Sequence, residues 1–442
     1  MKRHYAVPVI LLLLTLIYFP LRDYGVLEPK QLQTILVFIA LFFMLAMEYR
    51  HRTVVSLTSL LILWFLGIMK GEDMIHYLDL DVLGLLFGMM VIVEALREAG
   101  FLSILAGALT SLGFRKIYHL TIALSLFTFI TSALLDNATV MLIIIPMTLS
   151  ICETLNLGRA TVPVLIALSI SSNLGGLLTP IGDPPNIMAY SHLQISFIGF
   201  ILNIGPPTLL IYVISLAVIM TLFRREMTFE IGNKNDKEKP KIEKNSFLII
   251  SILVLTLVLL LFLLQDITGI SPSASALYGA TLLMIIGGRR MAPILREVNW
   301  DLLIFLGSIL IFSGSLEKVG ILYLLAQIIS KSTHGNPYIL TTLIAWLSSL
   351  VSALVDNIPY AAVMIPVIDE LVSLTGYYEL WWVFLISVGL GGIATPIASV
   401  PSLLTYSALR DKFEFKFLDF MKIGLIVWII LTLSLNLYYL LL

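Results

Sequence analysis

Long apolar runs recur along almost the whole of this 442-residue chain. Runs at about 5–21, 31–47, 53–69 and 80–96 each approach the roughly 20 residues that a membrane-spanning helix needs. Only 12% of the residues are charged, against roughly 25% in soluble domains. Because lipid offers no hydrogen-bond partner to a peptide group, spans of this kind must be helical or close into a barrel. At this length the runs predict an all-α polytopic membrane protein with about eleven transmembrane helices.

Lysine and arginine in the short loops predict the orientation. Lys2 and Arg3 precede the first run, and Arg50 and Arg52 lie between the second and third. Such residues stay on the cytoplasmic side, so we expect a multi-pass protein of the plasma membrane with a cytoplasmic N-terminus and an external C-terminus. The first run has no small-residue cleavage site after it, which favours a first helix over a signal peptide. Residues 97–117 predict an amphipathic helix on the cytoplasmic face.

Two longer apolar stretches are interrupted at their middle. The run from His119 to Glu153 contains Asp136-Asn137 and then Pro146, which indicates a kinked helix or a re-entrant hairpin. Residues 160–199 contain closely spaced glycines and prolines, which cannot continue one helix. We therefore expect a helix that is broken near the middle of the membrane.

The second half of the chain repeats the first. An offset of 220 residues relates Asp81 to Asp301, Gly100 to Gly320, Asp136-Asn137 to Asp356-Asn357 and Pro146 to Pro366, and an offset of 216 relates Gly175-Gly176 and Thr179-Pro180 to Gly391-Gly392 and Thr395-Pro396. Between the helices that begin at Asp81 and Asp301 the number of spans is odd. The two repeats therefore have inverted topology, related by an axis in the membrane plane.

These features divide the chain into five parts. We predict N-terminal scaffold helices at 1–79, a first inverted repeat at 80–223 with a hairpin at about 118–153 and a broken helix at about 160–199, a charged cytoplasmic linker at 224–245, scaffold helices at 246–300, and a second inverted repeat at 301–442 with a hairpin at about 338–374 and a broken helix at about 380–409. Inverted repeats with broken helices are typical of secondary transporters, whose site lies near the midplane.

The interruptions supply the chemistry that a transporter site needs. A broken helix frees carbonyl oxygens for a cation and helix N-termini for an anion, and a carboxylate at membrane depth can bind a cation or carry a proton. The candidate substrate- and ion-binding residues are Asp136, Asn137, Asp356 and Asn357 in the hairpins, and Asn173, Gly176, Thr179, Asp183, Asn186, Thr395, Ser399 and Ser402 in the broken helices. Sodium is a possible ligand of Asp136, Asn137, Asp356 and Asn357. A structural alternative is that Asp136 and Asp356 cap helices and that Asp183 stabilises a turn.

Other sequence features give no support to catalysis. No nucleotide-binding, hydrolase or metalloprotease motif is present, and Cys152 is the only cysteine, so we expect no enzyme, no cofactor and no nucleic-acid partner. Glu94 and Arg97, spaced three apart on one helix, predict a structural ion pair. A passive channel and a membrane scaffold or enzyme subunit are further alternatives, which the inverted repeats and the polar residues at depth make less favourable.

The segments SALLDNATVMLIIIPM, NLGGLLTPIGDPPNIM and SALVDNIPYAAVMIP resemble the ion transporter superfamily. The similarity is closest to the branch of arsenite permeases, NhaD-type sodium/proton antiporters and the melanocyte P-protein, and more distant to the divalent anion/sodium symporters and citrate transporters. The resemblance covers residues 30 to 440. It implies eleven transmembrane helices with two re-entrant hairpins, an elevator movement of a transport domain against a scaffold, and a homodimer in the lipid bilayer.

The hairpin tips depart from the dicarboxylate branch of that superfamily. There the tips read Ser-Asn-Thr, whereas here they read Asp136-Asn137-Ala138 and Asp356-Asn357-Ile358. A dianion would meet two carboxylates, with no arginine or lysine in either core segment to offset them. We therefore expect secondary active transport, coupled to protons or sodium, of a small inorganic ion or a neutral oxyacid such as arsenite, or sodium/proton exchange. Sodium- or proton-coupled transport of dicarboxylate or citrate is the alternative.

Overall fold

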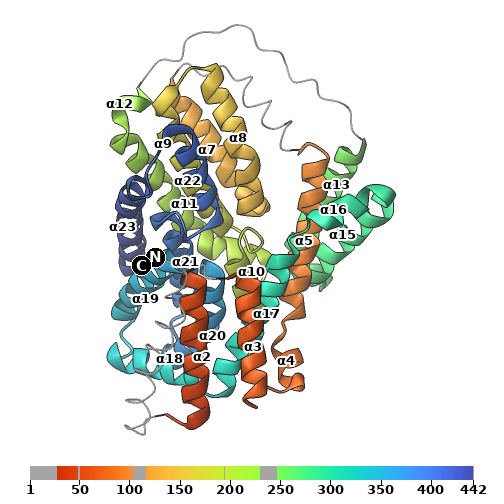
Figure 1. The fold of residues 1–442 in the computed structure, drawn as a ribbon, viewed down its shortest axis with the longest axis vertical. Coiled ribbons are helices and arrows are strands. Elements are labelled where there is room, and N and C mark those ends of the chain that lie inside the picture. Colours follow the sequence, from red (N-terminus) through yellow and green to blue (C-terminus); the bar gives the residue numbers. More distant parts are fainter. Residues whose placement is uncertain are drawn as a thin grey trace.

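The computed structural model of the chain describes residues 27–47, 50–101, 104, 116–193, 195–228 and 246–441, and these are mainly helical (Figure 1). Ten helices in this part are long and apolar enough to cross a membrane. They are α2 (Pro29–Ala46), α7 (Ile117–Leu134), α8 (Asn137–Thr154), α9 (Thr161–Leu177) with its preceding turn, α11 (Phe197–Leu222), α13 (Ser246–Leu263), α17 (Trp300–Lys318), α19 (Pro337–Leu354), α20 (Asn357–Thr375) and α23 (Phe417–Leu441). The predicted all-α polytopic class is confirmed.

Other helices complete the spans and the connections between them. They are α3 (Arg52–Phe65), α4 (Gly71–Tyr77), α5 (Leu80–Glu98), α10 (Pro184–Leu193), α12 (Arg224–Met227), α14 (Gln265–Thr268), α15 (Pro272–Gly287), α16 (Met291–Glu297), α18 (Ile321–Ser332), α21 (Leu380–Ala394) and α22 (Val400–Phe413). The predicted span at 5–21 and most of the predicted amphipathic helix at 97–117 lie outside the described residues.

The helix starts show that the repeat reaches further toward the N-terminus than the matching sequence motifs indicate. The offset of 220 residues separates the first residues of α3 and α15, of α4 and α16, and of α5 and α17, as well as those of α7 and α19 and of α8 and α20. Helix positions have therefore kept a symmetry that the side chains have largely lost. The division of the chain into scaffold and repeats at 79 and 300 stays a prediction.

Each hairpin packs against the broken helix of its own half. α7 and α8 form the first hairpin and pack on α9, and α19 and α20 form the second and pack on α21. In Figure 1, α7, α8 and α9 occupy the upper part of the molecule, whereas α19 and α20 lie below α21. The contact between α9 and α21 joins the two units.

The same side-chain contacts fasten both hairpins. Ser132 donates to the carbonyl oxygen of Ser172 at 2.8 Å, and Ser352 donates to that of Val388 at 2.7 Å. Thr179 donates to the carbonyl of Ala133. At the equivalent place, Thr395 donates to the carbonyl of Ala353 at 2.9 Å. These four buried hydroxyls hold each hairpin to its broken helix near the point where both are interrupted.

Glycine allows the close approach that these contacts require. A Cβ atom on Gly175 would lie 2.2 Å from the carbonyl oxygen of Phe129, and one on Gly391 would lie 2.6 Å from that of Ser349. Real Cβ atoms are not found that near to a backbone oxygen. The glycines of the two broken helices are therefore packing residues, which let two backbones touch.

The remaining helices form a second layer beside the hairpins. α5 packs on α13 and α15, and α3 packs on α2 and α17. Both packings include a hydroxyl that donates to a carboxylate, from Thr53 to Asp301 and from Ser273 to Asp81. The two contacts occupy equivalent places in the two halves of the chain.

Candidate functional site

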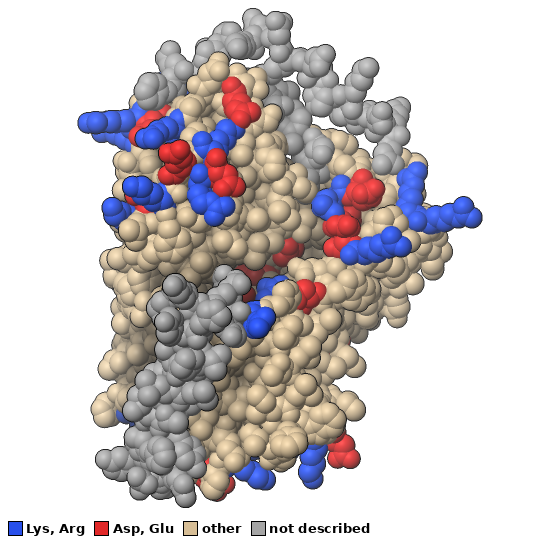
Figure 2. All heavy atoms as spheres, viewed as in Figure 1, with Lys and Arg blue, Asp and Glu red and all other residues tan. Residues whose placement is uncertain are grey.

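A cavity of about 910 Å³ lies between the two hairpin tips and the helices α2, α3, α5 and α17. Its polar and charged lining residues are Arg50, His51, Arg52, Glu94, Arg97, Asp136, Asn137, Thr139, Asp183, Glu297, Asn299, Asp356, Asn357 and Ser399. Figure 2 shows acidic and basic side chains around a hollow in the middle of the molecule. Apolar side chains such as Leu86, Leu302 and Phe305 complete the wall.

The first hairpin tip is an extended turn that ends in a helix cap. Leu135 is extended, and an oxygen of Asp136 accepts hydrogen bonds from the backbone nitrogen of Thr139 at 2.9 Å and from its hydroxyl at 3.1 Å. The sequence Asp-Asn-Ala-Thr therefore starts α8 with a capping carboxylate. Asp136 therefore does cap a helix, as the structural alternative predicts, and its carboxylate nevertheless lines the cavity.

The second tip is also capped by its aspartate, and it makes two further contacts. Asp356 accepts a hydrogen bond from the backbone nitrogen of Ile358 at 3.1 Å, and its Oδ2 lies 3.8 Å from a guanidinium nitrogen of Arg52. Asn357 donates from Nδ2 to Asp183 Oδ2 at 3.2 Å. Through this bond the second hairpin contacts the broken helix of the first half.

The turn of the first broken helix is held by one amide. Nδ2 of Asn186 donates to the carbonyl oxygens of Gly176, Leu177 and Thr179 at 3.2, 3.0 and 2.9 Å. Its Oδ1 is buried and has no hydrogen-bond partner among the described residues. Asn186 is thus a residue of the cavity's supporting wall, where it satisfies carbonyls that the broken helix leaves free.

In the second broken helix, serines replace this amide. Ser399 and Ser402 both donate to the carbonyl oxygen of Gly392, at 2.9 and 2.7 Å. Ser399 lines the cavity at the position equivalent to Asp183, so the second turn presents a hydroxyl where the first presents a carboxylate.

The structure separates the predicted site residues into two groups. Asp136, Asn137, Asp183, Asp356, Asn357 and Ser399 line the cavity. The other six, Asn173, Gly176, Thr179, Asn186, Thr395 and Ser402, are buried in the wall behind it. Their predicted role in binding stays a prediction, and the hydrogen bonds of Thr179, Asn186, Thr395 and Ser402 show that these side chains hold the broken helices in shape.

Sequence reasoning missed Arg52 as a site residue. It served only as a marker of orientation, yet its side chain reaches Asp356 and lines the cavity. Within their predicted bounds, the hairpins and the broken helices contain no arginine or lysine. A neighbouring helix nevertheless brings in a cation, and the sequence did not indicate it because the contact joins positions 304 residues apart.

The predicted pair of Glu94 and Arg97 is confirmed. Arg97 donates from Nε to Glu94 at 2.8 Å, and it also lies 3.5 Å from Glu297. Glu94 and Arg97 both belong to α5, and the contact of Arg97 with Glu297 joins α5 to the end of α16. All three side chains line the cavity, where they add one net negative charge when ionised.

The cavity can bind a small cation or hold protons. Asp136, Asp183 and Asp356 reach it from three different segments, and carboxylate and amide oxygens are ligands that hard cations accept. Among the described residues, no group of three or more histidine, cysteine or acidic side chains is arranged around a common metal position. Sodium at Asp136, Asn137, Asp356 and Asn357 stays a prediction, since backbone carbonyls could supply further ligands.

A family model described as citrate transporter matches residues 39–387. The chain belongs to this citrate transporter family. An uncharacterized transporter of Mycobacterium tuberculosis (strain CDC 1551 / Oshkosh) is 33% identical over 406 residues, which cover 89% of this chain and 94% of that protein. The 46 kDa membrane protein of Mycobacterium leprae is 31% identical and is covered to 95%.

The chain is also similar in sequence to a mammalian protein and in fold to a solved structure. The P protein of Mus musculus is 26% identical over 491 residues, which cover 90% of this chain and 58% of that protein. The YdaH transporter of Alcanivorax borkumensis, whose crystal structure was described as having an unusual topology, superposes with a TM-score of 0.61 at 14% identity over 83% of this chain and 85% of that one. The resemblance to the ion transporter superfamily is confirmed, and this chain is a multi-pass membrane transporter.

Proposed function

We propose that this transporter is secondary active and moves a small inorganic ion or a neutral oxyacid in exchange for, or together with, protons or sodium. The observation that carries the proposal is the convergence of Asp136, Asp183 and Asp356 on one cavity, where Arg52 lies 3.8 Å from Asp356. Three carboxylates and one guanidinium leave an excess of negative charge when all are ionised. Binding a cation or protons relieves that excess.

The same charges disfavour a dianionic substrate. Two like charges 4 Å apart repel by about 4 kcal/mol at the effective dielectric constant of a protein surface. A dicarboxylate beside Asp136 and Asp356 would meet this repulsion several times over, and Arg52 would offset only part of it.

The mechanism that fits best is an elevator movement, in which both hairpins and broken helices travel past the other helices as one body.

In the predicted orientation, the cavity opens toward the cytoplasm, because Arg50 and Arg97 line it and mark that side. The conformation then corresponds to an inward-facing carrier with a cytoplasmic N-terminus and an external C-terminus. We further propose that two copies associate in the membrane, which light scattering of the detergent-solubilised protein would test.

The main test uses the protein reconstituted in liposomes. A sodium or arsenite gradient should drive proton movement reported by a trapped pH dye, and Asp136→Asn with Asp356→Asn should reduce the rate at least about tenfold. Asp411→Asn is the matched control, since Asp411 is an exposed residue of α22. Unchanged transport in the double variant would contradict the proposal, and flux without accumulation against a gradient would indicate a channel.

Citrate or another carboxylate is the second candidate substrate. It is favoured by Arg52 at the cavity and by the description of the family. Guanidinium groups bind carboxylates through paired hydrogen bonds. Uptake of labelled citrate that is stimulated by sodium or protons, and that competes with arsenite, would establish this candidate over the first.

A further inference from the structure

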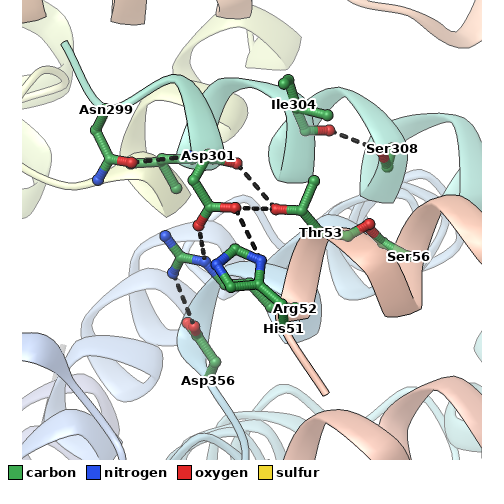
Figure 3. Close-up of polar contacts among 10 residues, drawn as sticks. His51, Arg52, Thr53, Ser56, Asn299, Asp301, Ile304, Ser308 and Asp356 are labelled. Carbon is green, nitrogen blue, oxygen red and sulfur yellow. Dashed lines mark hydrogen bonds and ion pairs between the residues drawn. The ribbon is translucent and has the colours of Figure 1, made fainter. Parts of the chain in front are cut away.

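Arg52 connects the hairpins to the helices around them. It is the first residue of α3, and its Nε donates to Asp301 Oδ2 at the start of α17 at 2.9 Å. Its guanidinium carbon lies 5.2 Å from the centre of the Phe305 ring. From this anchored position it approaches Asp356 at the tip of the second hairpin, as Figure 3 shows.

The equivalent packing in the other half of the chain forms without an arginine. There α15 packs on α5, and Ser273 donates to Asp81 as Thr53 donates to Asp301. The residue equivalent to Arg52 is Pro272, which carries no charge. The contact of hydroxyl with carboxylate is therefore common to both halves and joins the helices. Arg52 is an addition on one side only, and helix packing alone does not account for it.

The contact between Arg52 and Asp356 depends on the position of the hairpin. Arg52 is fixed to α17, whereas Asp356 belongs to the unit of α19, α20 and α21. Both side chains are partly accessible from the cavity, at 28% and 37% exposed, so a dissolved cation can reach the same carboxylate. Any displacement of the second hairpin along α3 separates the two groups.

Other charged groups complete the surroundings of Asp356. His51 Nδ1 lies 3.3 Å from Oδ1 of Asp301, the residue that Arg52 also contacts. The remaining charged residues around the same cavity are Arg50, Glu94, Arg97, Asp136, Asp183 and Glu297. Among the described residues, Arg52 is the cation that lies within ion-pair distance of Asp356. Asp136 at the first tip accepts from Thr139 instead.

We propose that Arg52 is the resident counter-cation of Asp356 and competes with the transported cation for that carboxylate. This inference rests on the proposed cation coupling. In the conformation described, Arg52 neutralises Asp356 and favours release of the cation into the cavity. When the hairpin has moved away from α3, Asp356 loses this partner and binds a cation more tightly. Arg52 thus acts as a positioning and affinity-setting residue, and in the part of the chain that the structure describes it forms an ion pair with Asp356 but none with Asp136.

The inference is tested by titrating reconstituted protein with sodium and with protons on the cavity side. Arg52→Gln should lower the cation concentration for half-maximal transport by roughly two- to fivefold, the range expected for a partly exposed ion pair. Arg289→Gln, on the exposed turn before α16, is the control and should leave it unchanged. In an Asp356→Asn background the substitution of Arg52 should cause no further shift.

Three outcomes separate the possibilities. A half-saturating concentration that is the same in Arg52→Gln as in the native protein, with maximal rate and thermal stability preserved, overturns the inference. A native protein without any cation-coupled transport overturns the proposed function itself. If Arg52→Gln does not fold, Arg52→Lys keeps the charge but cannot hold Asp301 and approach Asp356 with one planar group. Arg52→Lys is then expected to lower the cation concentration for half-maximal transport by a smaller factor. An unchanged concentration would contradict the proposed competition for Asp356.

Discussion

The two hairpin tips share a backbone plan and differ in what their acids contact. Asp136 and Asp356 both cap the second helix of their hairpin. Asp136 accepts hydrogen bonds from both the backbone nitrogen and the hydroxyl of Thr139. Asp356 accepts one hydrogen bond, from a backbone nitrogen, and faces Arg52. The carboxylate of the first tip thus finds its hydrogen-bond partners within its own helix, whereas the carboxylate of the second tip is partly neutralised by an arginine of α3.

The broken helices differ in the same way. Asp183 and Asn186 of the first half are Ser399 and Ser402 in the second, and only the first turn presents a carboxylate to the cavity. The contacts that have remained symmetric are the glycines and hydroxyls that hold hairpin and helix together. The comparison teaches that the contacts common to both halves maintain the architecture, whereas some of the side chains that face the cavity differ between the halves.

The largest expected effect tests the symmetric contacts. Gly175→Ala and Gly391→Ala should each prevent folding, because the new methyl group would overlap a backbone carbonyl that cannot move. Yield and monodispersity in size-exclusion chromatography would measure the loss. Gly205→Ala on α11 is the control, since its nearest neighbour would be 3.8 Å away. A normal yield for one glycine variant but not the other would break the symmetry of the two halves.

The next effect tests the asymmetric positions. Asp183→Asn should reduce transport at least about tenfold, because it removes the carboxylate that only the first half has and that Asn357 contacts. Ser399→Ala, at the equivalent position, removes a hydrogen bond to Gly392 and should lower the rate by a smaller factor. Initial rates in proteoliposomes would be compared at equal protein content. An equal loss of transport rate in both variants would show that the two turns contribute equally to transport.

A smaller effect is expected for the two threonines. Thr179→Val and Thr395→Val keep the shape of the side chain and leave the carbonyls of Ala133 and Ala353 without their donors. Each should lower the free energy of unfolding by about 1 to 3 kcal/mol, and by similar amounts. Thermal unfolding in detergent measures this, with Thr256→Val on an exposed face of α13 as the control. A large difference between the two would mean that one hairpin is held more firmly.

The smallest effect concerns an ion pair away from the hairpins. Lys318 donates to Asp73 at 2.5 Å, and this hydrogen bond, with one from the backbone of Lys70, lowers the pKa of Asp73 below its ordinary value of 3.8. A lowered pKa in the folded protein stabilises it above the ordinary pKa, and the stabilisation is lost as the pH falls through the folded-state pKa.

Lys318→Met should therefore lower the melting temperature slightly near pH 7 and not at pH 2. Lys331→Met on α18 serves as the control. Neither variant should change the cation concentration for half-maximal transport, in contrast to Arg52→Gln. A change in Lys318→Met would mean that the effect of Arg52 is not specific to its contact with Asp356.

Local signals in the sequence were sufficient to predict the helices, the hairpin tips and the broken helices. Hydropathy marks the spans, proline and glycine mark the breaks, and a carboxylate in an apolar run marks each tip. All of these act over a few residues. The offset between the repeats followed from the motifs around Asp136 and Asp356, where the copies have stayed similar.

The rest depended on contacts between distant segments. Arg52 approaches Asp356 only because α3 and the second hairpin are neighbours in space, and no local pattern indicates this. The sequence also could not separate Asp183, which lines the cavity, from Asn186, which holds the wall three residues later. Asp183 directly precedes α10 and Asn186 lies in its first turn, and their roles differ by the direction in which each side chain points.

The way the hairpins are fastened has an evolutionary consequence. The hydroxyls of Ser132, Ser352, Thr179 and Thr395 bond to backbone carbonyls, and none of these bonds includes the side chain of Asp136 or Asp356. Replacement of either aspartate would remove a helix cap but none of these four bonds. A lineage that keeps the four hydroxyls can therefore vary the residues at the tips while each hairpin stays fastened to its broken helix.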